Sequence, residues 1–320
     1  MKPAILLTGR SGQIGGELLK LLPLFGEVTA PDRHEMDLSH PEEIRRVVRS
    51  AKPRLIVNAA AYTAVDQAES ETSAAQAINA EAPAVLADEA KKLNAALVHY
   101  STDYVFDGLK NTPYEENDPT NPVNVYGATK LAGEEAVRGA GIPHLIFRTQ
   151  WVYATRGRNF LLTILRLATL REELRIVHDQ FGAPTWCREI ASCTVKVLTP
   201  FFVKGLDAFF SPEVEGICHM TAAGATSWYE FAKAIMEEAY RVPLHTPWMA
   251  AATGERALLA RSIVPIATAE FPTAARRPAY SVLSNKRLAQ IFGFQMPDWR
   301  TQLHSVFAGS TAMSQPSHLR

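Results

Sequence analysis

Tyr126 and Lys130 form the pair of residues in this sequence that is best suited to acid–base chemistry. They are four residues apart in NVYGATKLAGEEA, so on a helix they lie on one face. An ammonium beside a phenol lowers the pKa of that phenol from about 10 towards neutral pH, which makes Tyr126 a general acid for a carbonyl that is being reduced. The same spacing is common by chance and also fits an ordinary pair on an exposed helix.

Two further polar residues, Thr102 and Asp103, stand at the end of a predicted strand in HYSTDYVFDG. Open α/β sheets bind their ligands outside the carboxyl ends of the strands. The hydroxyl of Thr102 would therefore reach the carbonyl oxygen that Tyr126 protonates. This placement favours the acid–base interpretation of Tyr126 and Lys130 over a chance pair.

A glycine-rich turn, GRSGQIGG, follows the first predicted strand and contains Gly9, Gly12 and Gly15. Glycines in this place allow a tight turn, a close approach to a pyrophosphate and close packing of helix on strand, and the helix N-terminus offers N–H donors to the phosphate. Glycine turns are common, but here Asp32 and Arg33 follow at the end of the second predicted strand. This order predicts a dinucleotide site.

The charges around that site leave the choice of nicotinamide cofactor open. Asp32 would accept the ribose hydroxyls of NAD, whereas Arg10 and Arg33 would favour the extra phosphate of NADP. All three residues also fit a solvated loop. We therefore expect either NADPH or NADH as the cofactor.

The elements that position these groups follow from short apolar runs that alternate with longer helical patterns. Strands are predicted over residues 4–7, 27–30, 55–58, 96–101 and 144–148, and helices over residues 15–22, 41–51, 72–80, 83–93 and 126–139. Continuous apolar runs such as LIVN are typical of buried parallel strands. The predicted fold class is α/β, with a Rossmann-type, doubly wound parallel sheet and a smaller mixed α/β C-terminal substrate domain.

The second half of the chain is less regular. Helices are predicted over residues 159–173 and 188–202, with a strand over residues 217–220. The predicted division is a dinucleotide-binding domain over residues 1–150, completed by a segment near 186–204, a mainly substrate-binding domain over 151–308, and a disordered tail over 309–320.

Composition excludes several classes of protein. Lys plus Arg and Asp plus Glu each number 33, so no basic surface for nucleic acid is predicted. Cys187, Cys193 and Cys218 match no zinc or redox spacing and are expected to be reduced and packed. The apolar run over residues 4–7 is too short for a signal peptide or a membrane span. We expect a cytoplasmic protein that binds neither nucleic acid nor membrane.

Longer strings in the sequence resemble the extended short-chain dehydrogenase/reductases and, among them, the dTDP-4-dehydrorhamnose reductase family. The strings are VNAAAYTAVDQAE at 57–69, STDYVFDG at 101–108, NVYGATKLAGE at 124–134, FRTQWVY at 147–153, DQFGAPT at 179–185 and TAARRP at 273–278. They extend over nearly the whole chain to about residue 305. In this order and spacing they are highly specific.

The resemblance implies that Thr102, Tyr126 and Lys130 form a catalytic triad. With the glycine turn and its charges, it implies a cofactor site made of Gly9, Arg10, Gly12, Gln13, Ile14, Gly15, Asp32, Arg33, Asp37, Leu38, Ala61, Tyr62, Thr63, Tyr126 and Lys130. It implies a sugar-nucleotide site made of Thr102, Asp103, Tyr126 and Trp151.

Aromatic and basic residues elsewhere are interpreted more plainly. On chemistry alone Trp151 would be a core residue, and only the resemblance places it in the site. We do not extend that role to three other tryptophans, Trp186, Trp228 and Trp299. The tandem arginines at 276 and 277 would either pair with a diphosphate or have a structural role.

The sequence departs from the family pattern where some members hold a magnesium ion that bridges a dimer with three glutamates. Glu17 and Glu189 occupy two of these positions, but Lys286 falls at the third. We therefore expect no metal site. A monomer and a homodimer both remain open.

The implied function is the NAD(P)H-dependent reduction of dTDP-4-dehydro-L-rhamnose at its 4-keto group, which gives dTDP-L-rhamnose for cell-surface polysaccharide such as lipopolysaccharide O antigen. One alternative is a related nucleotide-sugar epimerase or dehydratase, but a 4,6-dehydratase usually has a glutamate where Tyr104 stands. The other is a non-enzymatic NADP-binding regulatory subunit, whose family has serine in place of Thr102 and lacks the sugar-site strings. These differences favour a reductase of a small-molecule nucleotide sugar.

Overall fold

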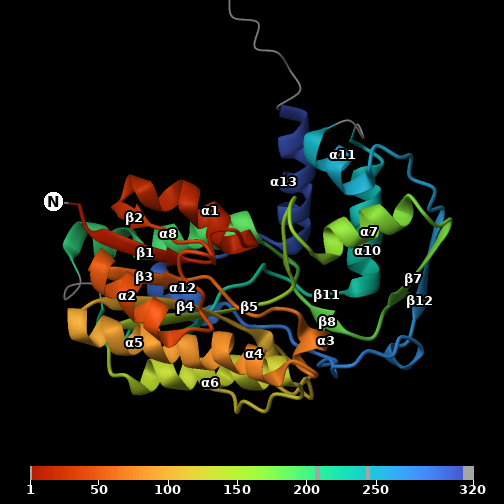
Figure 1. Ribbon diagram of the computed structural model, residues 1–320. Helices are drawn as coiled ribbons and strands as arrows, with labels where there is room; N and C mark the ends of the chain where they lie inside the picture. The colour runs from red at the N-terminus through yellow and green to blue at the C-terminus, as the bar shows by residue number, and fades with distance from the viewer. Residues whose placement is uncertain (1, 206–209, 243–245, 313–320) are drawn as a thin grey trace, which may run out of the picture.

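A computed structural model describes residues 2–205, 210–242 and 246–312 of the chain. Its first lobe contains a six-stranded sheet in the order β10-β5-β4-β3-β1-β2, with every neighbouring pair parallel (Figure 1). The strands are β1 (Ala4–Thr8), β2 (Glu27–Thr29), β3 (Leu55–Asn58), β4 (Ala96–Thr102), β5 (His144–Thr149) and β10 (Gly216–His219). The predicted α/β class with a Rossmann-type parallel sheet is confirmed.

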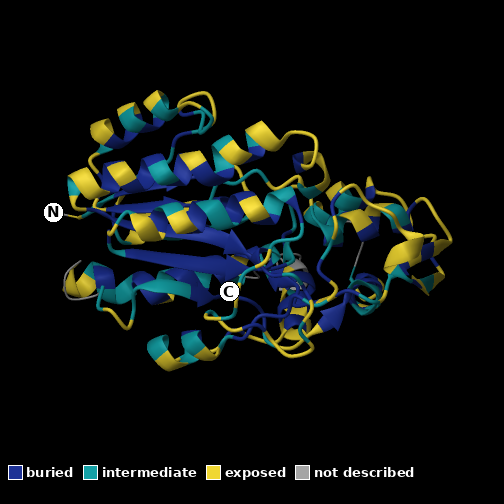
Figure 2. Cartoon of the chain, turned by 90° about the horizontal axis from the view of Figure 1, so that it is seen from below, coloured by how far each residue is buried: buried dark blue, intermediate teal, exposed yellow. Residues whose placement is uncertain are grey.

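Helices cover both faces of this sheet. The helix α1 (Gln13–Leu21) lies with α8 (Cys187–Lys204) on one face, and α2 (Pro41–Ala51), α5 (Ala82–Leu93) and α6 (Val125–Gly139) lie on the other (Figure 1). Figure 2 shows buried strands between helices whose outer faces are exposed. The shorter helices of this lobe are η1 (Leu22–Leu24), α3 (Val65–Ala68), α4 (Thr72–Gln76), the π-helix η2 (Ala77–Glu81), η3 (Asp103–Val105) and α12 (Lys286–Phe292).

The strands are apolar on both faces because both faces are covered. Along β1, Leu7 packs into the cluster that contains Leu18 and Ile190, whereas Leu6 packs into the opposite cluster with Ile44 and Leu86. Successive side chains of a strand point to opposite faces, so a run such as LIVN supplies both interfaces. Burial of each such side chain stabilises the fold by about 1.5–3 kcal/mol.

The order of the strands reverses next to β1. From β1 the chain pairs β2 on one side and later places β3 on the other. The loops after β1 and β3 therefore diverge and leave a crevice at the carboxyl ends of the strands, where open α/β sheets bind ligands.

A second lobe packs around its own apolar cluster, which includes Tyr153, Leu161, Phe231 and Trp299 (Figure 1). Its strands pair as β7 with β12, β6 with β9 and β8 with β11. The elements are β6 (Val152–Tyr153), α7 (Phe160–Ala168), β7 (Glu173–Val177), β8 (Phe181–Gly182), β9 (Thr185–Trp186), β11 (Thr226–Ser227), α10 (Trp228–Ala239), α11 (Pro247–Thr253), β12 (Ser262–Ile266), η4 (Thr268–Glu270) and α13 (Trp299–Ala312).

Several predicted boundaries differ from the structure. The helix predicted over residues 159–173 ends at Ala168, and the strand β7 begins at Glu173 with alternating burial. The predicted tail begins inside α13, which continues to Ala312, and residues 313–320 lie outside the described residues. The strand β2 ends at Thr29, so Asp32 lies in the loop beyond it. Beyond the segment 186–204, β10 and α12 also pack into the first lobe.

The three cysteines are free and buried, as predicted. Burial raises the pKa of the Cys187 thiol to about 12. Among the described residues, no helix has the length and the apolar character needed to cross a membrane.

Candidate active site

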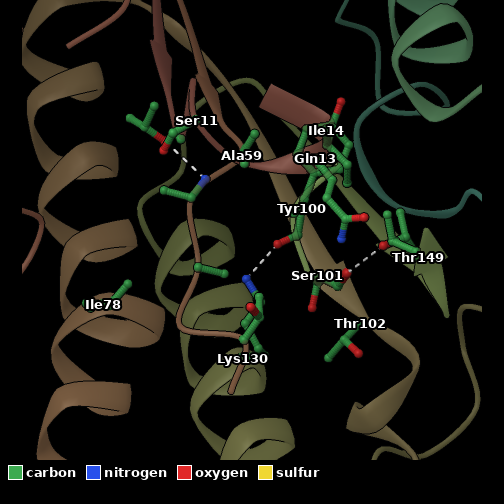
Figure 3. A pocket seen from close by; sticks show the side chains of 18 of the residues that line it. Ser11, Gln13, Ile14, Ala59, Ile78, Tyr100, Ser101, Thr102, Lys130 and Thr149 are labelled. Carbon is green, nitrogen blue, oxygen red and sulfur yellow. Dashed lines mark hydrogen bonds between the residues drawn. The ribbon is translucent and has the colours of Figure 1, made fainter. Parts of the chain in front are cut away.

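A cavity of about 720 Å³ lies at the carboxyl ends of the strands, and both lobes contribute to its lining. Figure 3 shows residues of the glycine turn, of β4 and of α6 around it. The predicted site residues that line it are Gly9, Arg10, Gly12, Gln13, Ile14, Asp32, Arg33, Asp37, Leu38, Ala61, Thr63, Thr102, Asp103, Tyr126, Lys130 and Trp151.

Two predicted cofactor residues, Gly15 and Tyr62, do not line the cavity. Gly15 is buried behind the turn, where a Cβ atom would stand 2.1 Å from the carbonyl oxygen of Gly9. Glycine at this position therefore allows α1 to pack against the turn. The hydroxyl of Tyr62 donates to Glu71 (2.8 Å), and its backbone N–H donates to Asn79 (2.9 Å). Both polar groups of Tyr62 are thus held by neighbouring residues.

The glycine turn has the geometry of a pyrophosphate cradle. Gly9 has a φ of +73°, and a Cβ atom there would lie 2.7 Å from the backbone of Ala59 and Ala60. The helix α1 begins at Gln13, and its N-cap residue Gly12 offers no side chain to the first N–H groups. These N–H groups form the positive, N-terminal end of the helix dipole. Because this end lies at the cavity, it favours an anion there.

The charged residues near this turn are largely paired with one another. Arg10 donates to Asp32 (2.7 Å) and to the carbonyl of Ala30 (2.8 Å). A backbone hydrogen bond at Glu35, with further bonds from His34 and Arg10, lowers the pKa of Asp32. Arg33 is 80% exposed and contacts Asp37 (3.3 Å). Of Arg10 and Arg33, Arg33 is therefore the one that presents its guanidinium mainly to solvent.

Tyr126 stands in the first turn of α6. The N-cap residue Asn124 accepts a hydrogen bond from the N–H of Gly127 (2.8 Å), which fixes the start of the helix. A Cβ atom at Gly127 would lie 2.1 Å from the carbonyl oxygen of Tyr104, so glycine lets this turn of α6 pack against η3. Thr102 ends β4 immediately before η3. Strand end and helix start thus bring the predicted catalytic groups together.

The environment of Tyr126 differs from the predicted one. Burial raises the pKa of its phenol to about 12, the hydroxyl of Thr102 lowers it in part, and Asp103 raises it. The ring also contacts Tyr104 edge to face at a centroid distance of 5.6 Å. The predicted lowering of this pKa by Lys130 is not found: burial has the largest effect, and the ammonium of Lys130 donates to the carbonyl of Tyr100. At neutral pH Tyr126 therefore carries its proton, as a proton donor must.

Lys130 is fully buried and its ammonium is engaged inside the lobe. Its Nζ donates to the carbonyl of Tyr100 (2.6 Å) and lies 3.3 Å from Nε2 of His99 (Figure 3 shows the bond to Tyr100). Burial lowers the pKa of Lys130 to about 8, and Glu134 acts in the opposite direction. Lys130 therefore keeps its charge at neutral pH but is close to losing it.

Asp103 is a buried carboxyl on the cavity wall. The hydroxyl of Thr102 donates to its Oδ1 (3.0 Å). Burial raises the pKa of Asp103 to about 7, and hydrogen bonds from Ser281 and Thr102 offset part of this effect. The cavity thus holds a carboxyl whose charge changes near neutral pH.

Two tryptophans stack at the second-lobe end of the cavity. The rings of Trp151 and Trp228 lie 3.4 Å apart at an angle of 8°, and both residues line the cavity. Trp151 has a φ of +44°, and a Cβ atom at Gly182 would meet its ring at 2.5 Å. The expectation that Trp228 lies outside the site is wrong, because the pairing of β11 with β8 brings the start of α10 to the cavity.

An arginine of the second lobe, which no sequence motif indicates, forms hydrogen bonds with the glycine turn. Arg156 lines the cavity and donates to the carbonyls of Gly12 (3.2 Å) and Gln13 (3.1 Å). Asn159 also donates to the side-chain oxygen of Gln13 (2.9 Å). Neither residue belongs to a motif, and only the folded chain brings them to the turn.

Arg276 and Arg277 do not line the cavity. Arg277 forms a two-pronged ion pair with Asp66 (2.8 and 2.7 Å), which joins the loop before Tyr280 to the first lobe. The carbonyl of Arg276 accepts a hydrogen bond from Asn124 (2.8 Å). These contacts indicate a structural role.

Two of the three residues expected at magnesium positions form ion pairs with other residues. Glu17 pairs with Lys20 (2.9 Å), and Lys286 pairs with Glu115 (2.9 Å). Within the described part of the chain, no group of three or more His, Cys, Asp or Glu residues is arranged to hold a metal ion. The expected lack of a metal site stays a prediction.

Comparison with known proteins places the chain in a family. Residues 1–311 match the family model described as the RmlD substrate binding domain. The chain is 52% identical to the dTDP-4-dehydrorhamnose reductase of Burkholderia thailandensis over 297 residues, which cover 92% of this chain and 95% of that protein. Among solved structures it is similar to dTDP-4-dehydrorhamnose reductase of Clostridium acetobutylicum (TM-score 0.83, 34% identity, 96% and 99% of the two chains covered).

A third relative was solved with a nucleotide. It is the dTDP-4-dehydrorhamnose reductase of Bacillus anthracis in complex with NADP, with a TM-score of 0.82, 33% identity and coverage of 97% and 100% of the two chains. These matches extend along nearly the whole length of the chain. The protein therefore belongs to the dTDP-4-dehydrorhamnose reductase family.

Proposed function

We propose that this protein reduces the 4-keto group of dTDP-4-dehydro-L-rhamnose to give dTDP-L-rhamnose, with NADPH or NADH as an exchangeable co-substrate. One observation carries the proposal: Thr102, Tyr126 and Lys130 line a single cavity with the glycine turn and Trp151, in a chain of this family. The dinucleotide would lie along the first lobe, and residues 151–308 would mainly hold the sugar nucleotide.

The residues of the first lobe fit a nicotinamide dinucleotide. The N–H groups at the start of α1 and the tight turn that Gly9 allows suit a pyrophosphate. Asp32 suits a ribose diol, and the exposed Arg33 suits the extra phosphate of NADPH, so we expect both nucleotides to be used. The relative from Bacillus anthracis that was solved with NADP supports this assignment.

When bound, the nicotinamide supplies a hydride to C4 of the sugar. Tyr126 donates its phenolic proton to the 4-oxygen, and its pKa of about 12 keeps that proton in place until the oxygen becomes basic. The phenolate that remains is costly in a buried site. Lys130, one helical turn away, would supply the compensating positive charge, and its ammonium would bind the nicotinamide ribose.

Two neighbouring groups would bind the reacting sugar. Thr102 would donate its hydroxyl to the same 4-oxygen and stabilise the charge that develops there. This donation requires the hydroxyl to leave Oδ1 of Asp103, its acceptor in the present structure. Asp103 would then accept a sugar hydroxyl, and Trp151 would cover the ring.

The alternative functions are less well supported. At the position where a dehydratase usually carries the carboxylic acid of a glutamate, this chain has the phenol of Tyr104. A regulatory subunit would not need a cavity in which a protonated phenol, a hydroxyl and an ammonium occur together. A cytoplasmic location is proposed because the reaction consumes a reduced nicotinamide.

The test is an assay of nicotinamide absorbance with dTDP-4-dehydro-L-rhamnose, made in place by its upstream enzymes, and identification of the sugar product. We expect one NADPH or NADH to be oxidised for each dTDP-L-rhamnose formed, by protein purified mostly free of nucleotide. Tightly bound NAD that is released only on denaturation, without net oxidation during turnover, would support an epimerase or dehydratase instead. Absence of any turnover with intact nucleotide binding would support the regulatory subunit.

A further inference from the structure

A buried chain of polar side chains runs across the sheet and ends at Lys130. Thr8, Asn58 and His99 occupy matching positions on the neighbouring strands β1, β3 and β4. The hydroxyl of Thr8 lies 2.6 Å from the amide oxygen of Asn58, and the amide nitrogen of Asn58 lies 3.0 Å from Nδ1 of His99. The other ring nitrogen of His99 lies 3.3 Å from Nζ of Lys130.

This chain is sealed from solvent. Thr8 and Asn58 are each 1% exposed, and His99 is fully buried. Burial and the nearby ammonium of Lys130 hold the pKa of His99 well below its ordinary value, so the imidazole is neutral. A neutral imidazole has one nitrogen that accepts a hydrogen bond.

Few other charges act on this pair. Glu134, one turn further along α6, attracts the ammonium of Lys130. Arg148 of β5 holds both carboxylate oxygens of Glu134 (2.9 and 2.6 Å). Glu134 is thus already paired. Within the described residues, the acceptors that contact Nζ of Lys130 directly are His99 and the carbonyl of Tyr100.

We propose that His99 is a positioning residue for Lys130, whose ammonium it holds in place and keeps charged by accepting a hydrogen bond at Nε2. The inference rests on the proposed function because it assumes that charged Lys130 serves the nicotinamide ribose. His99 does not touch the substrate or the cofactor. It acts through Lys130 alone.

The proposed role requires one polarity along the chain. A lysine ammonium can only donate, so Nε2 of His99 accepts and Nδ1 carries the hydrogen. The amide of Asn58 must then turn its oxygen to Nδ1 and its nitrogen to Thr8, whose hydroxyl can accept or donate. In the orientation that the structure shows, the amide nitrogen of Asn58 donates to Nδ1 of His99. Nε2 then carries the hydrogen and faces Lys130 as an uncharged amine. A half-turn of one amide thus matches the chain to either state of Lys130.

The proposal is tested by the pH dependence of NADPH binding, measured by fluorescence titration. Affinity should fall at alkaline pH as Lys130 loses its proton, and Lys130→Met should bind weakly at every pH without this transition. His99→Leu removes the acceptor, and loss of a hydrogen bond to a charged group should move the midpoint down by about one to two pH units. His99→Gln, whose side-chain oxygen can take the place of Nε2, should restore most of the difference.

His144→Gln is the matched control, because this buried histidine of β5 contacts the carbonyl of Ile142 and Glu215 rather than Lys130. Its midpoint should equal that of the unmodified protein. The proposal is overturned if His99→Leu keeps the original midpoint, if both His99 variants shift it equally, or if the transition survives in Lys130→Met. A protein that binds NADPH in this way but reduces no sugar would refute the proposed function and leave the role of His99 intact.

A second measurement does not depend on a folded His99→Leu variant. Nitrogen-15 NMR of histidine-labelled protein, with the His99 signals assigned by their loss in His99→Gln, reports which ring nitrogen carries the hydrogen. Below the alkaline midpoint we expect the hydrogen on Nδ1. A hydrogen on Nε2 at that pH would contradict the proposal.

Discussion

Replacement of Asp103 by asparagine should make the protein more stable at pH 8 and less active. The Asp103 side chain is buried on the cavity wall, and burial raises its pKa to about 7, against 3.8 for an exposed aspartate. The folded protein therefore binds this proton more tightly than the unfolded chain. The free energy of unfolding therefore falls as the pH rises from about 4 to 7. Above pH 7 it stays lower by the full amount.

The size of the effect follows from the difference between the two pKa values. At about 1.4 kcal/mol per pH unit, the ionised Asp103 carboxyl costs up to roughly 4 kcal/mol at pH 8. Asparagine keeps the shape and the oxygen that accepts from Thr102 but carries no charge. We expect the free energy of unfolding of Asp103→Asn to exceed that of the unmodified protein by up to about 4 kcal/mol at pH 8 and to equal it near pH 4.

Urea unfolding at several pH values measures this difference. The control is Asp107→Asn, because the hydroxyl of Tyr114 lowers the pKa of Asp107, and loss of that carboxylate should destabilise the protein at pH 8. Activity of Asp103→Asn with the sugar nucleotide should fall by about tenfold or more, since a charged acceptor is lost. A variant that is no more stable than the unmodified protein at pH 8, or a gain that does not change with pH, would refute this reasoning.

Three further substitutions test other parts of the site. Gly15→Ala should weaken NADPH binding by about tenfold or more, because the new Cβ would stand 2.1 Å from a backbone oxygen, whereas Gly139→Ala, with open space around its Cβ, should be neutral. Trp228→Ala should raise KM for the sugar nucleotide by about three- to tenfold without a change in NADPH affinity, and Trp228→Phe should lose less. Arg33→Ala should lower the preference for NADPH over NADH; an unchanged preference would remove Arg33 from the phosphate site.

Much of the first lobe could be predicted because its patterns are local. The strand over residues 55–58 and the helix over residues 41–51 have the predicted bounds, since a continuous apolar run and a helix that begins at proline are both clear signals. The short β2 is mostly exposed and lacks such a run, so its end was placed one residue late. The glycine turn and Tyr126 with Lys130 were likewise visible as short motifs.

The second lobe shows where sequence patterns are insufficient. The segment Glu173–Val177 is a strand because it pairs with Ser262–Ile266, almost ninety residues later, and that partner contains Pro265, which weakens its strand signal. Trp228 reaches the cavity through another long-range pairing, that of β11 with β8. No local spacing predicts such contacts.

The same limit applies to the environments of the predicted residues. The spacing of Tyr126 and Lys130 predicts that they share a helix face, but it contains no information on burial. In the folded protein burial raises the pKa of Tyr126, and Nζ of Lys130 lies 3.3 Å from Nε2 of His99. The register of β1, β3 and β4 aligns Thr8 with Asn58 and Asn58 with His99, and this alignment forms the environment of Lys130.

The central claim, that Tyr126 delivers the proton to the sugar oxygen, is tested most directly by steady-state kinetics of Tyr126→Phe with parallel titration of NADPH. Phenylalanine keeps the ring and its edge-to-face contact with Tyr104 but removes the acid. Turnover should fall by about 10² to 10⁴ while NADPH affinity and thermal stability remain. A Tyr126→Phe enzyme that stays within a few-fold of the unmodified protein would contradict the mechanism.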